Sequence, residues 1–381
     1  MRRAWGSSLA IAAGIVTLGA FRSLEAQGAL STQGFGYPGG QLSTRALGTG
    51  GALGDFDANS PINPAALSIG LRAAVYGQYD PEFRNVSSAS GTANSTTARF
   101  PVVGVSGRFG RATAGLSFSN LLDRSWSNTY FDSQTVGGRV VQSHITAQSS
   151  GGISDARAAL SYQVSERLYL GVGVHVFPGQ NRTTLAREFA DSLKTGSFTQ
   201  TNIFNFSGSA VSVGAIALPV PHLNIGASVR FGGAMHIRAG DSTVVGSASV
   251  PGRWSVSAAY DGLAGSALAV RYAREEWSSM RGLGSPGLVV NDVAEFAAGA
   301  EVAGPKLSGV PMALRFGYRA RDLPFAVGGN RIAERSLTAG VGLPVAGGRG
   351  AADVSLARAR RTTAGAGENG WILSIGFAIK P

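Results

Sequence analysis

The chain contains no cysteine among its 381 residues, and it is also poor in charge and in lysine. Without cysteine, disulfide bonds, thiolate nucleophiles and cysteine-based metal sites are excluded. Charged residues make up 14% of the chain, and the only lysines are Lys194, Lys306 and Lys380. Arginine therefore carries almost all of the positive charge. These arginines are spaced singly and not clustered, which argues against a nucleic-acid partner in spite of the formal net charge of +11.

Motifs for catalysis and metal binding are missing as well. No histidine pair has the spacing of a zinc site, and no G-x-S-x-G nucleophile motif occurs. The stretch "GAGENG" (365–370) has the letters of a dinucleotide motif but precedes a strand, so we interpret it as an outer loop. The paired carboxylates of "REEW" (274–277) favour a rim ion pair. We therefore expect no enzyme activity, no catalytic residue, no metal and no cofactor. The histidines lie in four different segments: His144, His175, His222 and His236.

Long apolar runs are absent too. The longest, residues 9–21, is too short for a membrane-spanning helix and comes after Arg2 and Arg3, which is typical of a secretory signal peptide. We predict a signal peptide over residues 1–26. The remainder of the chain is apolar on average and rich in glycine, with 55 glycines in the whole sequence. An exported chain of this kind without a spanning helix indicates a β-barrel, the other structure that satisfies its backbone in lipid.

The most prominent feature present in the sequence is strict alternation. In "LNIGASVRF" (223–231) every second residue is apolar, and the residues between are Asn, Gly, Ser and Arg. The stretch "WILSIGFAIK" (371–380) repeats the pattern. A transmembrane barrel places the apolar face toward lipid and the small or polar face toward the lumen. Aromatic residues near strand ends, among them Tyr76, Trp254 and Trp277, fit interfacial girdles. A soluble β-protein with an aromatic core is the alternative.

Connection lengths give the predicted topology. Short linkers such as 109–111 alternate with long ones such as 121–152 and 179–204, and the two long examples can hold strand extensions or a short helix. Bacterial barrels have short periplasmic turns, long outer loops and an even number of strands. We therefore predict an all-β, transmembrane antiparallel barrel of about 14 strands over residues 69–381. It is expected in the outer membrane of a Gram-negative cell, in contact with lipid and with both termini periplasmic.

The stretch "DFDANSPINPAAL" (55–67) precedes the first strand. Its polar side chains match positions 1, 3 and 5 of a calcium loop. The glycine and the glutamate that such a loop needs at positions 6 and 12 are replaced by Ser60 and Ala66. The metal interpretation is therefore rejected, and the two prolines of the stretch indicate a break in regular structure.

Residues 42–67 resemble the N-terminal signature of the FadL superfamily of outer-membrane barrels: a Gly/Ala-rich lead, an Asp/Asn step and then Asn63, Pro64 and Ala65. Residues 250–280 and 314–324 are similar to a late hairpin and the following outward strand of that family. The resemblance implies a barrel whose lumen is plugged by an N-terminal segment, here residues 27–68. The plug or gate residues are then expected to be Asp55, Asp57, Asn59, Asn63 and Pro64.

The function that the resemblance implies is passive, plug-gated uptake of hydrophobic small molecules such as long-chain fatty acids. Its expected partners are outer-membrane lipid, the substrate and the barrel-assembly machinery. The PorV-like branch of the family is the alternative, in which the barrel serves protein secretion as a shuttle or anchor and its partners are secreted proteins. The signature does not separate the two branches, and the chain shows no long apolar loop matching the capture site of the fatty-acid branch.

Arginines on the predicted lumen face are the candidate substrate path. They could pair with the plug carboxylates Asp55 and Asp57 or with a substrate carboxylate. Equally, they could bond only lumen backbone and water, since charge in a barrel lumen is common. These residues are Arg108, Arg157, Arg230, Arg271, Arg315 and Arg319.

Overall fold

The computed structural model describes most of the chain after residue 34. The predicted signal peptide (1–26) and the first eight residues of the predicted plug lie outside the described residues. Within the described ranges, no helix is long and apolar enough to cross a membrane. The described ranges are 35–70, 73–88, 91–136, 138–190, 197–283, 289–307, 309–327 and 329–379.

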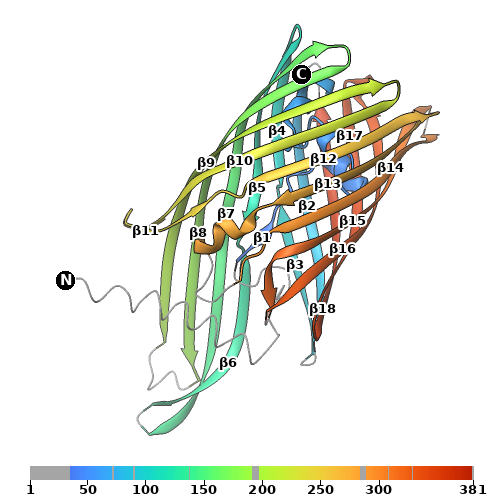
Figure 1. Cartoon of the computed structure of the whole chain (residues 1–381). Coiled ribbons are helices and arrows are strands. Elements are labelled where there is room, and N and C mark those ends of the chain that lie inside the picture. The colour runs from blue at the N-terminus through green and yellow to red at the C-terminus, as the bar shows by residue number, and fades with distance from the viewer. Residues whose placement is uncertain are drawn as a thin grey trace.

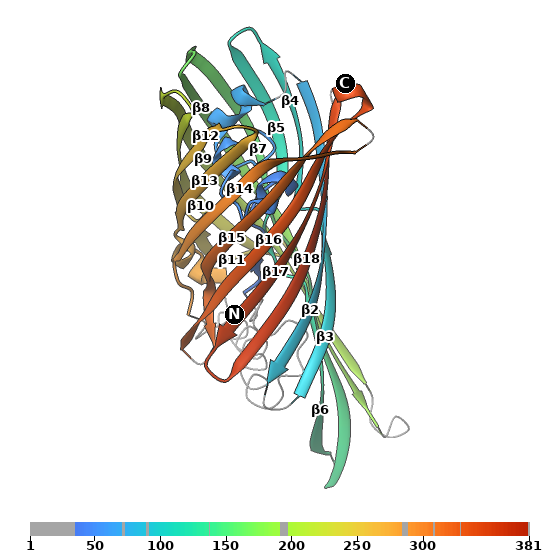
Figure 2. The same ribbon diagram turned by 90° about the vertical axis from the view of Figure 1, so that its right-hand side faces the viewer.

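The strands form one antiparallel sheet that closes into a 14-strand barrel, with β18 paired to β2 (Figures 1 and 2). Eleven wall positions are single strands: β2 (Ala73–Ser88), β7 (Arg139–Ser165), β8 (Leu168–Phe189), β9 (Phe198–Val220), β10 (Leu223–Ala239), β13 (Ser266–Glu275), β14 (Val293–Leu307), β15 (Val310–Val327), β16 (Asn330–Val345), β17 (Gly350–Thr363) and β18 (Ala366–Ile379). Three positions consist of two consecutive strands: β3 (Gly91–Arg99) with β4 (Val102–Phe109), β5 (Ala112–Asp123) with β6 (Trp126–Val136), and β11 (Val244–Ser249) with β12 (Arg253–Leu263). The predicted fold class and strand number are confirmed.

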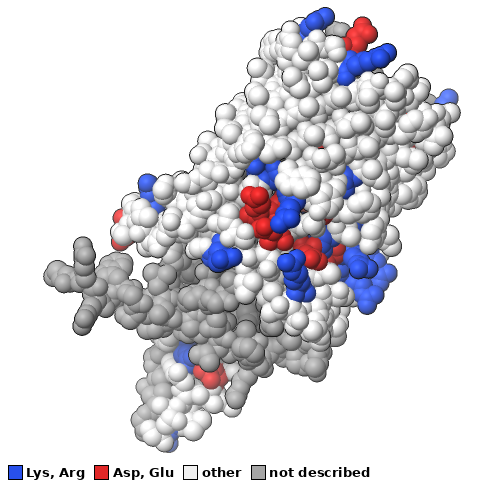
Figure 3. All heavy atoms as spheres, viewed as in Figure 1, with Lys and Arg blue, Asp and Glu red and all other residues white. Residues whose placement is uncertain are grey.

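The alternation in the sequence sorts side chains between the two faces of the wall. On β18, Trp371 and Phe377 are about half exposed on the outside, whereas Ser374 and Ala378 are buried inside. Figure 3 shows a broad band of the outer surface without Lys, Arg, Asp or Glu, between charged side chains at the upper end and a group across the middle. Such a band suits contact with lipid hydrocarbon, where charge is costly.

Several expected outer loops are strands instead. The outer loop expected at "GAGENG" is replaced by a two-residue turn, because Thr363 pairs with Ala366. Most of "GAGENG" therefore belongs to β18, and the interpretation of that stretch as a loop was wrong. The linkers 121–152 and 179–204 do hold strand extensions, in β6–β7 and β8–β9. These strands extend past the apolar band. Their outer parts are mostly polar on both faces, and for that reason the sequence there was interpreted as loop.

Two predicted girdle aromatics point inward. Tyr76 is 4% exposed, and its hydroxyl accepts from the backbone N–H of Thr44 at 2.9 Å. Trp277 is 1% exposed and begins the 3-10 helix η3 (Trp277–Leu283). Trp254 is 38% exposed on the outer face, as a girdle residue should be. Position near a strand end therefore did not identify the face of an aromatic side chain. A further 3-10 turn, η4 (Ala346–Gly348), joins β16 to β17.

The N-terminal segment, defined here as residues 35–70, lies against the inner faces of the wall on several sides and is almost entirely buried. It contains β1 (Tyr37–Pro38), α3 (Thr44–Gly48), η1 (Gly54–Phe56) and η2 (Pro64–Ile69). Ser43 caps α3 by accepting from the N–H of Ala46. Asn63 caps η2, and Pro64 occupies its first position, where no N–H is needed.

One part of the wall is interrupted. Among the described residues, β3 pairs in the ladder only with β2, and β6 only with β7, so the two diverge (Figure 2). The edge of β5 that β3 leaves is taken up by the N-terminal segment. Tyr37 pairs with Asp123, and the N–H of Gly39 donates to the carbonyl of Leu121 at 2.9 Å. The segment thus adds a short strand beside the interruption.

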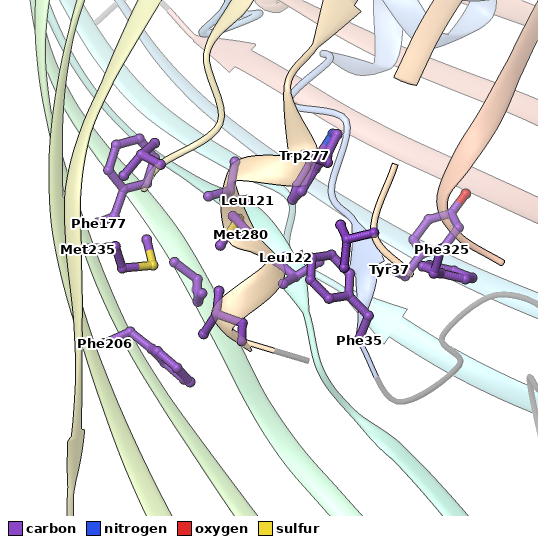
Figure 4. Packing of buried hydrophobic residues seen from close by; sticks show 14 of the residues in the cluster. Phe35, Tyr37, Leu121, Leu122, Phe177, Phe206, Met235, Trp277, Met280 and Phe325 are labelled. Carbon is purple, nitrogen blue, oxygen red and sulfur yellow. The ribbon is translucent and has the colours of Figure 1, made fainter. Parts of the chain in front are cut away.

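A large apolar cluster lies beside this short strand (Figure 4). Phe35 packs edge-on against Trp277, with ring centroids 6.1 Å apart, and also contacts Phe325. Aliphatic and aromatic side chains from the wall complete the cluster. The remaining labelled members are Tyr37, Leu121, Leu122, Phe177, Phe206, Met235 and Met280.

Candidate functional site

Tyr37 is the centre of a buried ionic network. Its hydroxyl donates to Oε2 of Glu334 at 2.8 Å and accepts from Arg321 and Arg361, each at 2.9 Å. The guanidinium groups of Arg361 and Arg99 lie 4.8 and 4.9 Å from the ring centroid. Cations over an aromatic face are attracted by its quadrupole. A residue of the segment is therefore held at both its ring and its hydroxyl.

The network continues into the wall through Glu82. This carboxylate is fully buried and lies 2.7 Å from both Arg84 and Arg99 and 2.8 Å from Arg361. Arg361 also lies 2.6 Å from Glu334. Buried ions are tolerated when each is paired and hydrogen-bonded. We call the inner faces of β12–β18, β2 and β3 the charged wall.

Asp55 anchors the middle of the segment. Its carboxylate is fully buried and accepts from the hydroxyl groups of Ser255 at 2.9 Å and Ser257 at 2.5 Å. Arg271 donates to it at 3.1 Å and to Glu295 at 2.6 Å. The expected pairing of a lumen arginine with Asp55 is therefore present. Whether this pair gates passage stays a prediction.

Asp57 and Asn59 act mainly within the segment. The carboxylate of Asp57 accepts from the hydroxyl of Ser43 and from the backbone N–H of Asn59, the latter at 3.1 Å. Among the residues that the structure describes, no arginine nitrogen lies within 4 Å of this carboxylate. The pairing with the wall that was considered for Asp57 is therefore absent from that part of the chain. Asn63, an expected plug residue, accepts from the N–H of Ala65 at 3.0 Å, as a helix cap.

Arg315 belongs to a second ionic group. It lies 2.6 Å from both Glu301 and Asp353, and Glu301 is also paired with Arg45 of the segment at 2.8 Å. The segment is thus attached to the charged wall at a third point. Arg45 is partly exposed, so solvent screens this pair more than the pairs around Tyr37.

The other predicted lumen arginines differ from one another. Arg319 lies 3.4 Å from Glu334, inside the network of Tyr37. Arg108 is only partly buried near a turn, and its Nε donates to the hydroxyl of Thr113 at 3.4 Å. The structure therefore does not bring Arg108 to the segment. Arg157 and Arg230 face a different part of the lumen.

That part, the inner faces of β5 and β7–β10, we call the glycine wall. A Cβ atom on Gly171 would lie 2.3 Å from the nitrogen of Ala65, and one on Gly214 would lie 2.0 Å from Oδ1 of Asn63. Only glycine permits so close an approach of another backbone. Helix η2 is therefore seated here by shape, where any larger residue would displace it.

The segment is also fastened to this wall by a polar chain. Ser212 Oγ lies 2.9 Å from Nε2 of His175, whose Nδ1 lies 2.8 Å from Asp155. Gln41 of the segment donates to the same carboxylate at 2.8 Å and accepts from Arg230 at 3.0 Å. Both oxygens of Asp155 are thereby occupied, one by the wall and one by the segment.

The order of these atoms is that of a serine hydrolase triad. Sequence reasoning missed the arrangement, because 20 residues separate Asp155 from His175 and 37 separate His175 from Ser212. Adjacent strands bring them together. Ser212 is only 3% exposed, so its oxygen is closed to a substrate in this conformation. In the described ranges, no group of three His, Cys, Asp or Glu could hold a metal ion.

No protein-family model matches the chain, and no curated protein matches its sequence. Solved structures do resemble its fold. A Pseudomonas aeruginosa FadL homologue matches with a TM-score of 0.61 at 13% identity, over 91% of this chain and 99% of that one. The Ralstonia pickettii toluene transporter TbuX matches with a TM-score of 0.56 at 14% identity, over 90% of this chain and 98% of that one. The CymD monoaromatic hydrocarbon channel matches with a TM-score of 0.56 at 14% identity, over 89% of this chain and 97% of that one.

The chain therefore has the fold of FadL-type outer-membrane channels, and the resemblance seen in the sequence is confirmed at the level of the fold. Identities of 13–14% show the fold alone.

Proposed function

We propose that this protein is an outer-membrane channel for hydrophobic small molecules. The observation that carries the proposal is the N-terminal segment, which is attached to opposite walls of a barrel with this fold. The solved structures of similar fold include channels named for toluene and for monoaromatic hydrocarbons. Transport of this kind needs no covalent step, so the chain is proposed to act as a transporter and not as an enzyme.

In this proposal residues 27–68 are the plug. Tyr37 and Asp55 attach it to the charged wall, and Asn63 and Pro64 position η2 against the glycine wall. Opening requires some of these contacts to break, and the buried pairs set the free energy of that step. Both termini are proposed to be periplasmic, because β2 begins and β18 ends at the end of the barrel opposite the long strand extensions of β6–β7 and β8–β9.

The proposed route uses the apolar cluster and the interruption of the wall. The cluster of Phe35, Trp277 and its neighbours offers an apolar surface inside a polar lumen. The interruption between β3 and β5–β6 lies beside it, and the segment covers the exposed edge of β5 at Tyr37. A hydrophobic molecule that displaces the segment there, and with it the Arg99–Asp123 pair that joins β3 to β5 at 2.7 Å, would reach the lipid sideways.

The test is uptake into liposomes. Intact protein and a variant lacking residues 27–66 are reconstituted, and the entry of a fluorescent long-chain fatty acid and of a monoaromatic hydrocarbon is followed separately. We expect saturable uptake of at least one of them by the intact protein and faster, less selective entry for the deletion variant. Equal rates for both proteins would contradict the plug. No uptake, together with copurifying exported proteins, would instead support the PorV-like role.

A further inference from the structure

One buried arginine differs from all the other buried arginines that the structure describes. Each of the others has a carboxylate oxygen within 4 Å. The buried arginines with such a carboxylate partner are Arg84, Arg230, Arg253, Arg271, Arg315, Arg319, Arg321 and Arg361. Arg157 on β7 is 4% exposed and has none among the described residues. Every buried arginine that the structure describes on the charged wall thus has a carboxylate partner, whereas Arg157 has none.

The guanidinium of Arg157 also has N–H donors without an acceptor. Its Nε and Nη1 are buried without any partner in the described structure. The nearest acidic residue along the strand, Asp155, is engaged by His175 and Gln41 and lies beyond 4 Å from the guanidinium. Removing a cation from water without a partner costs several kcal/mol. The structure therefore leaves a strong donor group unsatisfied.

A small cavity adjoins this side chain. It lies between residues 58–61 of the N-terminal segment and the inner faces of β2, β4 and β5, and Arg157 and Ser117 line it. Ser117 Oγ is likewise buried without a partner in the described ranges. Among the described residues that line the cavity, there is no aspartate or glutamate. Its free volume of about 20 Å³ has room for one particle slightly larger than a water molecule.

We propose that this cavity binds a small monovalent anion of halide size. Arg157 would supply the charge and one N–H donor, because its free Nε and Nη1 lie on different edges of the guanidinium, and Ser117 would supply a hydroxyl donor. Water could satisfy the donors but would leave the positive charge uncompensated, whereas an anion satisfies both. The cavity is too small for a carboxylate that carries an alkyl chain or a ring, so this site is separate from the proposed substrate route.

The position of the site links the anion to the segment. Residues 58–61 form one side of the cavity, so a seated segment completes the site and a displaced segment opens it. A ligand that binds only one of two conformations stabilises that conformation. The bound anion therefore favours the seated segment, whatever the channel carries.

Bromide diffraction tests the site directly. Crystals of the full-length protein are grown in bromide, and anomalous density is examined beside Arg157 and Ser117. We expect a peak there in the wild type and none in Arg157→Met, which keeps most of the side-chain volume without the charge. Arg108→Met, which removes a partly exposed arginine outside the cavity, is the matched control and should retain the peak. Water density in place of a bromide peak in the wild type overturns the proposal.

A second measurement keeps the test independent of one variant. The melting temperature is followed as chloride replaces gluconate at constant ionic strength. We expect a saturable rise for the wild type, a weaker response for Ser117→Ala and none for Arg157→Met. If Arg157→Met does not fold, the chloride responses of the wild type and of Ser117→Ala still test the site. Identical chloride responses in those two proteins, with no bromide peak, rule out the site.

Discussion

The charged wall and the glycine wall hold the same segment by opposite means. On the charged wall, Tyr37 and Asp55 are fixed by guanidinium, carboxylate and hydroxyl groups at hydrogen-bond distance. On the glycine wall, Ala65 approaches the backbone so closely that a single Cβ atom on Gly171 would collide with it. Polar contacts are directional and can re-form after a displacement, whereas close packing accepts one position only. We infer that the glycine wall determines the position of the segment and that the charged wall determines most of the free energy needed to displace it.

The largest effect is expected from breaking the charged wall at Asp55. Asp55→Asn leaves Arg271 with one carboxylate fewer and leaves a charge buried beside an amide. Breaking a buried pair costs about 3–5 kcal/mol. Hydrogen exchange at residues 52–58 should accelerate strongly, and the melting temperature should fall. Asp241→Asn, at an exposed loop position, is the control and should change neither quantity.

The glycine wall should respond differently to a change at Gly171. In Gly171→Ala, the new methyl group must move the backbone at Ala65, and overpacking of this kind costs about 1–3 kcal/mol. We expect higher ion conductance in a planar bilayer, with hydrogen exchange rising at η2 and not at Tyr37. The matched control is Gly77→Ala on β2, where an added Cβ meets nothing within 4 Å. A uniform rise in exchange along the whole segment would remove the distinction between the walls.

A smaller effect is expected at Tyr37. Tyr37→Phe removes the hydroxyl that bonds Glu334, Arg321 and Arg361 but keeps the ring under the guanidinium groups. Leaving buried polar groups without a partner costs about 1–3 kcal/mol. Exchange should rise at residues 35–42 while η2 stays protected. Tyr37→Ala should exceed this effect, because it also removes the cation–ring contacts. Equal effects of the two variants would mean that the ring contributes nothing.

The smallest effect is expected from an exposed ion pair. Arg331 lies 3.4 Å from Asp322, and both side chains are well exposed to solvent. Such pairs contribute about 0–1 kcal/mol. Arg331→Ala should therefore leave the melting temperature and the conductance close to those of the wild type. A large change would show that solvent exposure does not separate structural from incidental ion pairs in this barrel.

Sequence alternation was sufficient to predict the barrel fold and to predict which side chains of a strand point outward and which point inward. Residues such as Trp371 and Ser374 could be assigned because a strand places successive side chains on opposite faces. Alternation also placed Arg271 on the lumen face, but its pairing with Asp55 was one of several open alternatives and depended on the plug that the resemblance implied. The alternation did not show where strands end, since β17 and β18 continue it beyond the apolar band.

The contacts of the segment with the wall could not be predicted. Tyr37 and Glu334 are 297 residues apart, and nothing in the spacing of either residue points to the other. Gln41 and Asp155 meet because the segment lies inside the lumen against β7. The glycines under η2 are not distinguishable in the sequence from the many other glycines on strands. Long-range pairing in a barrel depends on strand register and tilt, which alternation alone does not determine.

The most direct test of the plug is a reversible lock. The hydroxyl oxygens of Thr44 in the segment and Ser374 on β18 lie 2.8 Å apart, and the chain has no cysteine of its own. In the double variant Thr44→Cys/Ser374→Cys, a disulfide can join the segment to the wall. We predict that oxidation lowers the uptake of the hydrophobic substrate at least several-fold and that a reductant restores it, with both single variants unaffected. Equal uptake by the oxidised and reduced protein would contradict the central claim that the segment must move for passage.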